Sequence, residues 1–577
     1  MKKYRKQILI CAGLVTLTNV AAQQQQKNDS TVNRTVVVEN QYNPEVMDAF
    51  KVNVLPKIEE PAVAKTQINY ASSVHQLNKF PVYHMDVMNR EVTEDKARRG
   101  YVRLAYGNRN NTDFKGSYLW NITDRDILDV MATFHGYSGN IDAGYDFDQV
   151  TDIPTLNYDK EWKHRFFRTG ASLKYTHDFD KVSMYVGGNF ASQVFSYMPD
   201  VQLSASTSQT EEKTDVPSFG HQLFMSGGGY VGVSSVKDAL PVEFGLQTGY
   251  KMFNRKHGIY IPEGISESVV NTKGYISAGI DDRQDIGVTF GMDNVFYDKS
   301  FSSYSLIKLR PYYSVKTESV SFTAGVNVDF QISNDGGLKL SPDVRFDYTF
   351  ADNYLLYVHV TGNTRLNDFG TINGFSPFWV QSPIYNSPLQ LNTTYTPYDA
   401  KIGLKASPFT GFGLGIYGGY RETRNELFSM PYSDEGGIYN RIAQAKARVA
   451  YAGLSVDYSF RDILDFGLNG NFYSWDVQKE MEKLLWLKPL YSIGFNARAK
   501  VFKGFHAMAQ YNYEGRKKTL GIKADAVNEL NIGAEYLFND RVNVFLKLNN
   551  LLNKNYVTES GYPVQGFNVM AGVSLNF

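Results

Sequence analysis

The sequence has almost no cysteine: Cys11 is the only one in 577 residues. It lies in an N-terminal segment with the layout of a cleavable secretory signal, so we expect the mature chain to contain none. Disulfide bonds are thereby excluded as a source of stability, although a secreted protein could form them. The fold must be held together by buried apolar surface and by backbone hydrogen bonds.

The signal segment has a basic start, a short apolar stretch at residues 8–20 and two small residues, Ala21 and Ala22. Its basic residues are Lys2, Lys3, Arg5 and Lys6. The apolar stretch is too short to span a bilayer as a helix, and we predict a signal peptide over residues 1–22, cleaved after Ala22. A lipoprotein signal at Cys11 is disfavoured, because only residues 7–10 separate this cysteine from the basic start.

Long apolar runs and excess charge are also missing from the rest of the chain. No stretch of about 18 apolar residues follows the signal, which excludes transmembrane helices. The full chain has 59 basic and 59 acidic residues; without the four basic residues of the signal, 55 remain against 59, a net charge of −4. Nucleic acid is therefore not an expected partner, because binding to phosphates requires a basic surface.

Aromatic residues and glycine are abundant instead, with 40 Tyr, 37 Phe and 48 Gly, although only 43% of the residues are hydrophobic. From Phe567 to Phe577 every second residue is apolar, and the residues between are mostly small or polar. The same alternation occurs at residues 320–330, 491–501, 530–538 and 542–549. Because side chains alternate across a strand, these segments predict strands with one lipid-facing side and one side facing a polar lumen.

A soluble β-sandwich is the alternative for any single strand of this kind. Its polar face would carry charges, whereas the polar positions here are largely Gly, Ser, Thr and Asn. Aromatic residues also recur at strand ends, as in the girdle of a membrane barrel. These residues are Tyr348, Phe350, Tyr458, Phe460, Tyr536 and Phe538.

Short and long connections alternate along the chain, which is typical of an outer-membrane barrel with tight periplasmic turns and long extracellular loops. Short turns are expected at residues 122–126, 177–181, 236–240, 281–284, 316–319, 350–353, 407–411, 460–463, 502–505 and 538–541. Longer connections are expected at residues 140–162, 198–221, 253–268 and 367–395. Counting the strands on both sides predicts an all-β fold, a large antiparallel transmembrane β-barrel of about 22 strands. The first strand is expected near 101–107 and the last at 567–577, while residues 436–447 and 486–490 remain ambiguous.

The C-terminal region has a motif in three parts, the stretch 549–556 (NNLLNKNY), then Gly561-Tyr562-Pro563, then Gly566 before the closing strand. This motif resembles the end of TonB-dependent receptors, although Phe567 stands where that family commonly has arginine. The resemblance covers residues 100–577 and implies a receptor-like barrel in the outer membrane. The terminal Phe577 is then expected to act as the C-terminal assembly signal that the barrel assembly machinery reads.

The N-terminal region departs from the family, because about 75 residues between signal and barrel are too few for the family's plug domain. The run Thr35, Val36, Val37 and Val38 is a possible Ton-box-like segment, and also simply a β-prone stretch. A barrel of this size needs something that narrows its lumen. We predict that residues 23–99 occlude the lumen or form a periplasmic segment; inward-folded loops or a separate capping protein are the alternatives.

Signals for catalysis or metal binding are few, so neither an enzymatic activity nor a cofactor is expected. His359 lies on the predicted lumen face and is interpreted as a polar wall residue. The other histidines that were considered, His164, His221 and His257, lack zinc-ligand spacing. The acidic loop residues Asp142, Asp146 and Asp148 lack the pattern of an EF-hand and are interpreted as solvated. The aromatic loop residues Phe378, Trp379, Tyr385, Tyr395 and Tyr398 could bind sugars or a lipoprotein, or pack on one another.

The sequence predicts two possible functions. The first is transport across the outer membrane, as a porin-like or partner-dependent channel. The second is a scaffold or assembly component that binds partner proteins through its loops or its N-terminal segment. Membrane lipid and the barrel assembly machinery are expected partners in both cases, and a periplasmic or surface lipoprotein is a possible one.

Overall fold

The computed structural model describes residues 99–147, 154–199, 222–237, 239–257, 264–298, 301–333, 336–351, 353–379, 391–434, 437–516, 524–539, 541–558 and 560–577. The predicted signal peptide, residues 23–98 and the Ton-box-like run 35–38 lie outside this part of the chain, so their predictions stay untested. Among the described residues, no helix is both long enough and apolar enough to cross a bilayer.

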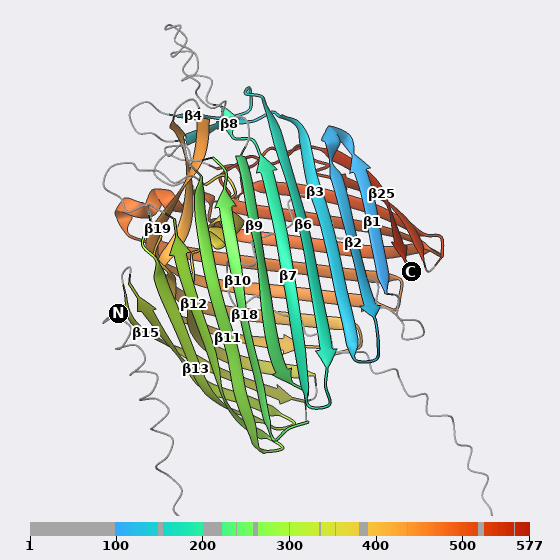
Figure 1. Ribbon diagram of the computed structural model, residues 1–577. Coiled ribbons are helices and arrows are strands. Elements are labelled where there is room, and N and C mark those ends of the chain that lie inside the picture. The colour runs from blue at the N-terminus through green and yellow to red at the C-terminus, as the bar shows by residue number, and fades with distance from the viewer. Residues whose placement is uncertain are drawn as a thin grey trace, which may run out of the picture. The chain divides into compact units, whose positions relative to one another are not determined.

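The described residues form a closed antiparallel β-barrel of 22 strands (Figure 1), which confirms the predicted fold class and strand number. Its strands are β1 (Gly100–Gly107), β2 (Thr112–Asn121), β3 (Asp126–Ile141), β6 (Trp162–Asp178), β7 (Val182–Phe195), β9 (Gln222–Ser235), β10 (Val242–Arg255) and β11 (Ile265–Asp281). They continue with β12 (Gln284–Tyr297), β13 (Tyr304–Lys316), β14 (Val320–Ile332), β15 (Gly337–Phe350), β16 (Tyr354–Arg365), β17 (Thr394–Ala406) and β18 (Phe412–Asp434). The last are β19 (Gly437–Phe460), β20 (Leu464–Val477), β21 (Pro489–Phe502), β22 (Phe505–Arg516), β23 (Val527–Leu537), β24 (Val542–Asn549) and β25 (Asn568–Asn576).

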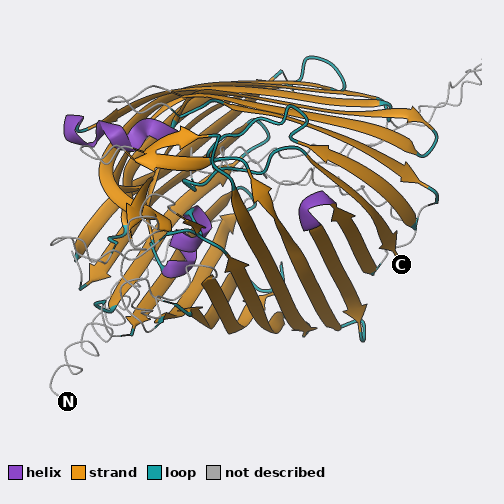
Figure 2. Ribbon diagram, turned by 90° about the horizontal axis from the view of Figure 1, so that it is seen from above, coloured by secondary structure: helices purple, strands orange, loops and turns teal. Residues whose placement is uncertain are grey.

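Smaller elements lie in the connections. They are the strands β4 (Gly144–Phe147), β5 (Pro154–Asn157) and β8 (Met198–Pro199), the helix α4 (Phe369–Phe375), and the 3-10 helices η2 (Asn108–Asn110) and η3 (Lys479–Leu487). Seen from above, the strands form a continuous wall and the helical segments are few and short (Figure 2). We call the end of the barrel with the ten short turns the turn end, and the opposite end, where β4 and β8 lie, the loop end.

The barrel closes by pairing its first strand with its last, β1 with β25. The backbone N–H groups of Arg99 and Gly100 donate to the carbonyl oxygen of Phe577 at 3.0 and 2.7 Å, and the Phe577 N–H donates to Gly100 at 2.9 Å. The Phe577 ring stacks on Tyr118, with ring centroids 6.1 Å apart. The wall therefore has no unpaired edge, although edges are where sheets usually aggregate.

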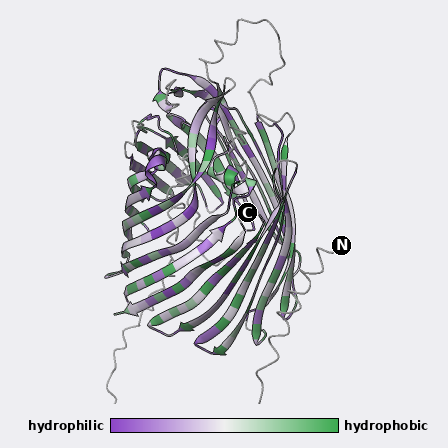
Figure 3. Cartoon of the chain, turned by 90° about the vertical axis from the view of Figure 1, so that its left-hand side faces the viewer, coloured by the Kyte–Doolittle hydropathy of each residue, from purple (hydrophilic) through white to green (hydrophobic). Residues whose placement is uncertain are grey.

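Hydrophilic and hydrophobic residues alternate along the strands (Figure 3), as the sequence predicts. On β24, Val544 and Leu546 point outward and are each 42% exposed, whereas Phe545 and Lys547 point inward and are buried. An exposed apolar exterior over a polar interior is the arrangement that a lipid environment requires. At the turn end, five of the six aromatic residues predicted as a girdle are exposed, with Phe538 the most exposed at 63%, and the sixth, Tyr458, is half-buried.

The inner wall explains the unusual abundance of tyrosine and glycine. Tyrosine rings lie over glycines on the neighbouring strand: a Cβ added to Gly187 would meet Tyr230 at 2.4 Å, and one added to Gly453 would meet Tyr417 at 2.3 Å. Inward charges form ion pairs along the wall, as between Arg498 of β21 and Glu535 of β23, which lie 2.6 Å apart across the intervening strand β22. The wall is thus tightly packed although its inner face is polar.

Candidate functional site

Segments from several connections fold together over the loop end around a buried aromatic cluster. Its aromatic members are Tyr145, Trp162, Phe195, Tyr197, Phe224, Phe253, Phe369, Phe378, Trp379, Tyr432, Tyr439, Trp486 and Tyr562. We call this layer the cap: it comprises β4, β5, β8, α4 with residues 376–379, η3, the outer halves of β18 and β19, residues 550–558 and 560–567, and the strand residues packed in the cluster, such as Trp162 and His164 of β6. Burial of this many aromatic side chains provides the main stabilisation of the layer.

The segment that follows β16 crosses the mouth of the barrel. Eight strands lie between β6 and β16 along the shorter way around the wall. Nevertheless, the ring of Phe378, which follows β16, lies 5.7 Å from that of His164 on β6. Nearer the start of the segment, Phe369 of α4 packs against Phe253 of β10, with ring centroids 5.9 Å apart. The cap is therefore a lid across the mouth, which agrees with the alternative that long loops fold inward.

The hairpin of β18 and β19 is the longest part of the cap, because its strands have 23 and 24 residues whereas β20 and β21 have 14. A register shift between Thr423 and Glu426 marks where the hairpin leaves the wall. There Asn425 has a φ of 55°. Its side chain donates to the Thr393 carbonyl oxygen at 3.1 Å. Such a bulge bends the paired strands and redirects them, here over the mouth.

The tip of this hairpin is joined to three other connections. Ile438 pairs with Met198 of β8. The backbone N–H of Asn440 donates to the Phe378 carbonyl oxygen at 3.1 Å. Its side-chain amide donates to Ser376 Oγ at 2.7 Å and to the Ser560 carbonyl oxygen at 2.6 Å. The tip thus fixes connections that come from different sides of the barrel.

A buried cation ties the cap to the wall. Arg255, the last residue of β10, is 1% exposed. Its guanidinium donates to the carbonyl oxygen of Trp379 at 3.2 Å, to the hydroxyl of Tyr197 at 2.8 Å and to the carbonyl oxygen of His257 at 2.9 Å. It also lies 5.2 Å from the centre of the Trp379 ring. The planar guanidinium reaches these three acceptors from three different nitrogens, whereas an ammonium would present all its donors from one atom.

The C-terminal motif belongs to the cap as well. Gly561 has a φ of +77°, a left-handed conformation that favours glycine, and a Cβ there would lie 2.7 Å from Asn440 Oδ1. The next residue, Tyr562, stacks on Phe378 with ring centroids 3.6 Å apart and donates its hydroxyl to the Ile438 carbonyl oxygen. Burial raises the pKa of Tyr562, so this hydroxyl keeps its proton.

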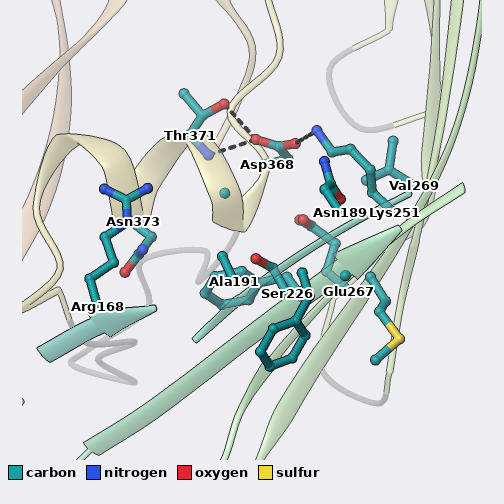
Figure 4. Close-up of a pocket in the computed structure, with 15 residues that line it drawn as sticks. Arg168, Asn189, Ala191, Ser226, Lys251, Glu267, Val269, Asp368, Thr371 and Asn373 are labelled. Carbon is teal, nitrogen blue, oxygen red and sulfur yellow. Dashed lines mark hydrogen bonds and ion pairs between the residues drawn. The ribbon is translucent and has the colours of Figure 1, made fainter. Parts of the chain in front are cut away.

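A pocket lies against the wall below α4 (Figure 4). Its volume is about 400 Å³, and its walls come from α4 and from five consecutive strands, β6, β7, β9, β10 and β11. The residues that line it are Arg168, Asn189, Phe190, Ala191, Ser226, Gly227, Lys251, Met252, Phe253, Glu267, Val269, Asp368, Gly370, Thr371 and Asn373. Sequence reasoning missed this pocket, because Asp368 and Asn373 reach it only by crossing the mouth.

Among the histidines and acidic residues named from the sequence, His359, Asp146 and His164 make side-chain contacts within the fold. His359 lies on the inner wall, as predicted, with its Nε2 2.9 Å from Asp347 Oδ1. Asp146 pairs with Lys160 at 2.6 Å, and this contact lowers the pKa of Asp146. His164 is buried in the cap. No group of three or more potential metal ligands occurs within the described ranges. His221, Asp148 and Tyr385 lie outside them.

The aromatic loop residues divide between the cap and the wall. Phe378 and Trp379 are buried in the cap, which confirms that this part of the loop packs on other aromatic side chains. Tyr395 and Tyr398 lie on β17, where Tyr398 stacks on Tyr420 with ring centroids 6.2 Å apart.

No protein-family model and no curated protein sequence matches this chain. Solved structures do match it. The ferric-catecholate import receptor Fiu of E. coli K12 is 11% identical, with a TM-score of 0.57 over 83% of this chain and 82% of that one. The siderophore receptor PirA of Acinetobacter baumannii is 10% identical, with a TM-score of 0.61 over 85% and 81%. The copper transporter OprC is 11% identical, with a TM-score of 0.57 over 85% and 82%.

These likenesses establish the fold alone, a large β-barrel. That fold agrees with the one that the resemblance of the C-terminal motif implies. The identities are low, so they do not carry over a ligand. They also leave the predicted lack of a plug domain untested, because residues 1–98 are not described.

Proposed function

We propose that this protein is an outer-membrane barrel that moves a solute across that membrane through a channel whose mouth its own cap closes. The observation that carries the proposal is the segment that crosses the mouth from β16 to β6. A barrel of about 22 strands is wide enough to contain an aqueous lumen unless something fills it. The turn end then faces the periplasm, and the loop end faces the outside.

A closed cap implies a channel that opens when a partner engages it, rather than an open porin. Two of the structural neighbours, the import receptor Fiu and the copper transporter OprC, support this class of function. Residues 23–98 remain a second proposed seal of the lumen, with 35–38 as the segment that a periplasmic partner would contact. Recognition of the C-terminal strand and of Phe577 by the barrel assembly machinery remains part of the proposal.

A scaffold is the second candidate, because the cap is held by buried hydrogen bonds such as those of Arg255 and Asn440. A cap that never opens would be a rigid outer surface on which a lipoprotein or another protein could bind.

Single-channel conductance in a planar bilayer tests the proposal. Four proteins are compared: the mature chain, a chain with a shortened hairpin, a chain that lacks residues 24–98, and the combination. In the shortened hairpin a two-residue Asn-Gly turn joins Glu426 to Ala445, two residues that are paired in the wall register. We expect no steady conductance from the mature chain and conductance from the combination.

The single variants show which seal matters. If the variant with the shortened hairpin conducts, the cap is the only seal. If only the combined variant conducts, residues 23–98 form a second seal. Steady conductance of the mature chain would mean that the cap does not close the mouth. If all four proteins insert and none conducts, the transport proposal fails and the scaffold is favoured.

A further inference from the structure

From the side chains that it presents, we infer that the pocket below α4 binds a small organic anion that carries hydroxyl groups. The charges of the pocket are balanced in number, since Arg168 and Lys251 face Glu267 and Asp368. Their surroundings differ, however, and the difference determines which of them can contact a ligand.

The acidic oxygens are engaged within the protein. Both carboxylate oxygens of Glu267 accept the backbone N–H of Phe369, at 3.0 and 2.8 Å. Asp368 accepts the backbone N–H of Thr371 at 2.7 Å, and its other oxygen lies 3.6 Å from the Lys251 ammonium. Both acids are buried, at 3% and 4% exposure. They hold the start of α4 against the wall and have little capacity left for a cation.

The donors, in contrast, remain available. The Arg168 guanidinium makes no ion pair within the part of the chain that the structure describes, and it lies across the pocket from Lys251 (Figure 4). The Lys251 side chain, 59% exposed, makes one ion pair among the described residues and has donors to spare. The side chains of Asn189 and Ser226 add neutral donors on the same wall. The free groups therefore match a ligand rich in acceptors and negative in charge.

One acceptor favours hydroxyl groups on that ligand. The amide N–H of Asn373 donates to Gln193 Oε1 at 3.2 Å. Its Oδ1 is buried and accepts no hydrogen bond from the described residues. A buried acceptor without a partner is costly, and a ligand hydroxyl would satisfy it. A volume of about 400 Å³ lies in the range of small-molecule sites.

Isothermal titration of the full-length mature protein in detergent tests this inference. The probes are gluconate, which has a carboxylate and hydroxyls, sorbitol, which has the hydroxyls alone, and inorganic phosphate, which has the charge alone. We expect gluconate to bind more tightly than sorbitol. Arg168→Gln and Lys251→Gln should each weaken gluconate binding roughly tenfold, the effect of losing one charge-assisted hydrogen bond.

Two features of the design separate the pocket from general effects. Lys174→Gln is the matched control, because it removes a cation from the same face of β6, about 20 Å from Arg168 and outside the pocket. It should leave gluconate binding unchanged. Lys251→Gln also removes the contact to Asp368, so Arg168→Gln is the decisive variant.

Phosphate identifies which group of the ligand is recognised. If phosphate competes with gluconate, the negative charge is sufficient for binding. If it does not compete, binding also requires the hydroxyl groups. The inference is overturned if gluconate and sorbitol bind equally, if no probe binds, or if Lys174→Gln has the effect of Arg168→Gln. The titration needs no membrane, so a negative result does not contradict the transport proposal. Likewise, a channel that does not conduct would not contradict this inference.

Discussion

Arg255 shows at the scale of one residue how the cap is joined to the wall. Its three hydrogen bonds end on two carbonyl oxygens and a hydroxyl. Within the described part of the chain the guanidinium has no carboxylate partner, so there it depends on these dipoles and on the Trp379 ring. Removing the guanidinium leaves several buried acceptors unpaired together.

Replacement of Arg255 by methionine is expected to lower the free energy of unfolding of the cap by about 2–4 kcal/mol, because buried acceptors lose their donors. Tryptophan emission during guanidinium titration measures this, since Trp162, Trp379 and Trp486 of the five tryptophans lie in the cap. Arg255→Lys keeps the charge but loses the planar group. The stability of its cap should lie between those of the unmodified protein and Arg255→Met. An unchanged unfolding transition in Arg255→Met would show that these hydrogen bonds make no net contribution to the stability of the cap.

The last connection shows why a family motif predicted the fold but no ligand. Asn550 and Asn553 both have a φ of 47°. The Asn550 side chain donates to the carbonyl oxygens of Lys554 at 2.8 Å and Gln565 at 3.0 Å. Asparagine tolerates this conformation and bonds its own backbone. The motif therefore specifies the course of a loop, and a loop of that shape can serve barrels of different function.

At the scale of elements, the sequence predicted the ten turns and most strands, because alternation and turn residues are local signals. Alternation disappears where an element is buried on both faces. Ile438 and Tyr439 are consecutive and both buried, so residues 436–447 were ambiguous in sequence. The same holds for residues 486–490, where Trp486 and Leu487 at the end of η3 are both buried. The pocket had no local signal, since Arg168, Lys251 and Asp368 come from three distant segments.

The pairing of β8 with the hairpin tip gives a prediction for these elements. The mature chain is expected to contain no cysteine, so a pair introduced as Met198→Cys and Ile438→Cys would have no competitor. Opposed residues on antiparallel strands have the Cα separation that a disulfide needs. We expect the bond to form under mild oxidation, seen as a mobility change on a non-reducing gel.

A matched pair controls for random encounter. Met198→Cys with Ala450→Cys uses the same strand β19 but a position about 40 Å away, and it should remain reduced. Equal yields from the two pairs would show that the tip is not held against β8.

At the scale of the whole molecule, the position of a residue relative to the wall should decide its tolerance to charge. Leu246 is 51% exposed on the outer face of β10, and its neighbour Gln247 points inward. Leu246→Arg should cost about 2–4 kcal/mol in folding into lipid vesicles, because the charge enters the hydrocarbon region. Gln247→Arg should cost much less. Urea titration in vesicles measures both variants, and an equal effect would argue against a lipid-facing exterior.

The seam between β1 and β25 has a consequence for quality control of the chain. The two strands come from opposite ends of the barrel sequence, so the ring cannot close before β25 is present. A chain truncated before β25 would present unpaired strand edges on β1 and β24, which favour aggregation. Closure of the seam therefore distinguishes a chain that contains both strands from a truncated one, and gives quality control a structural feature to recognise.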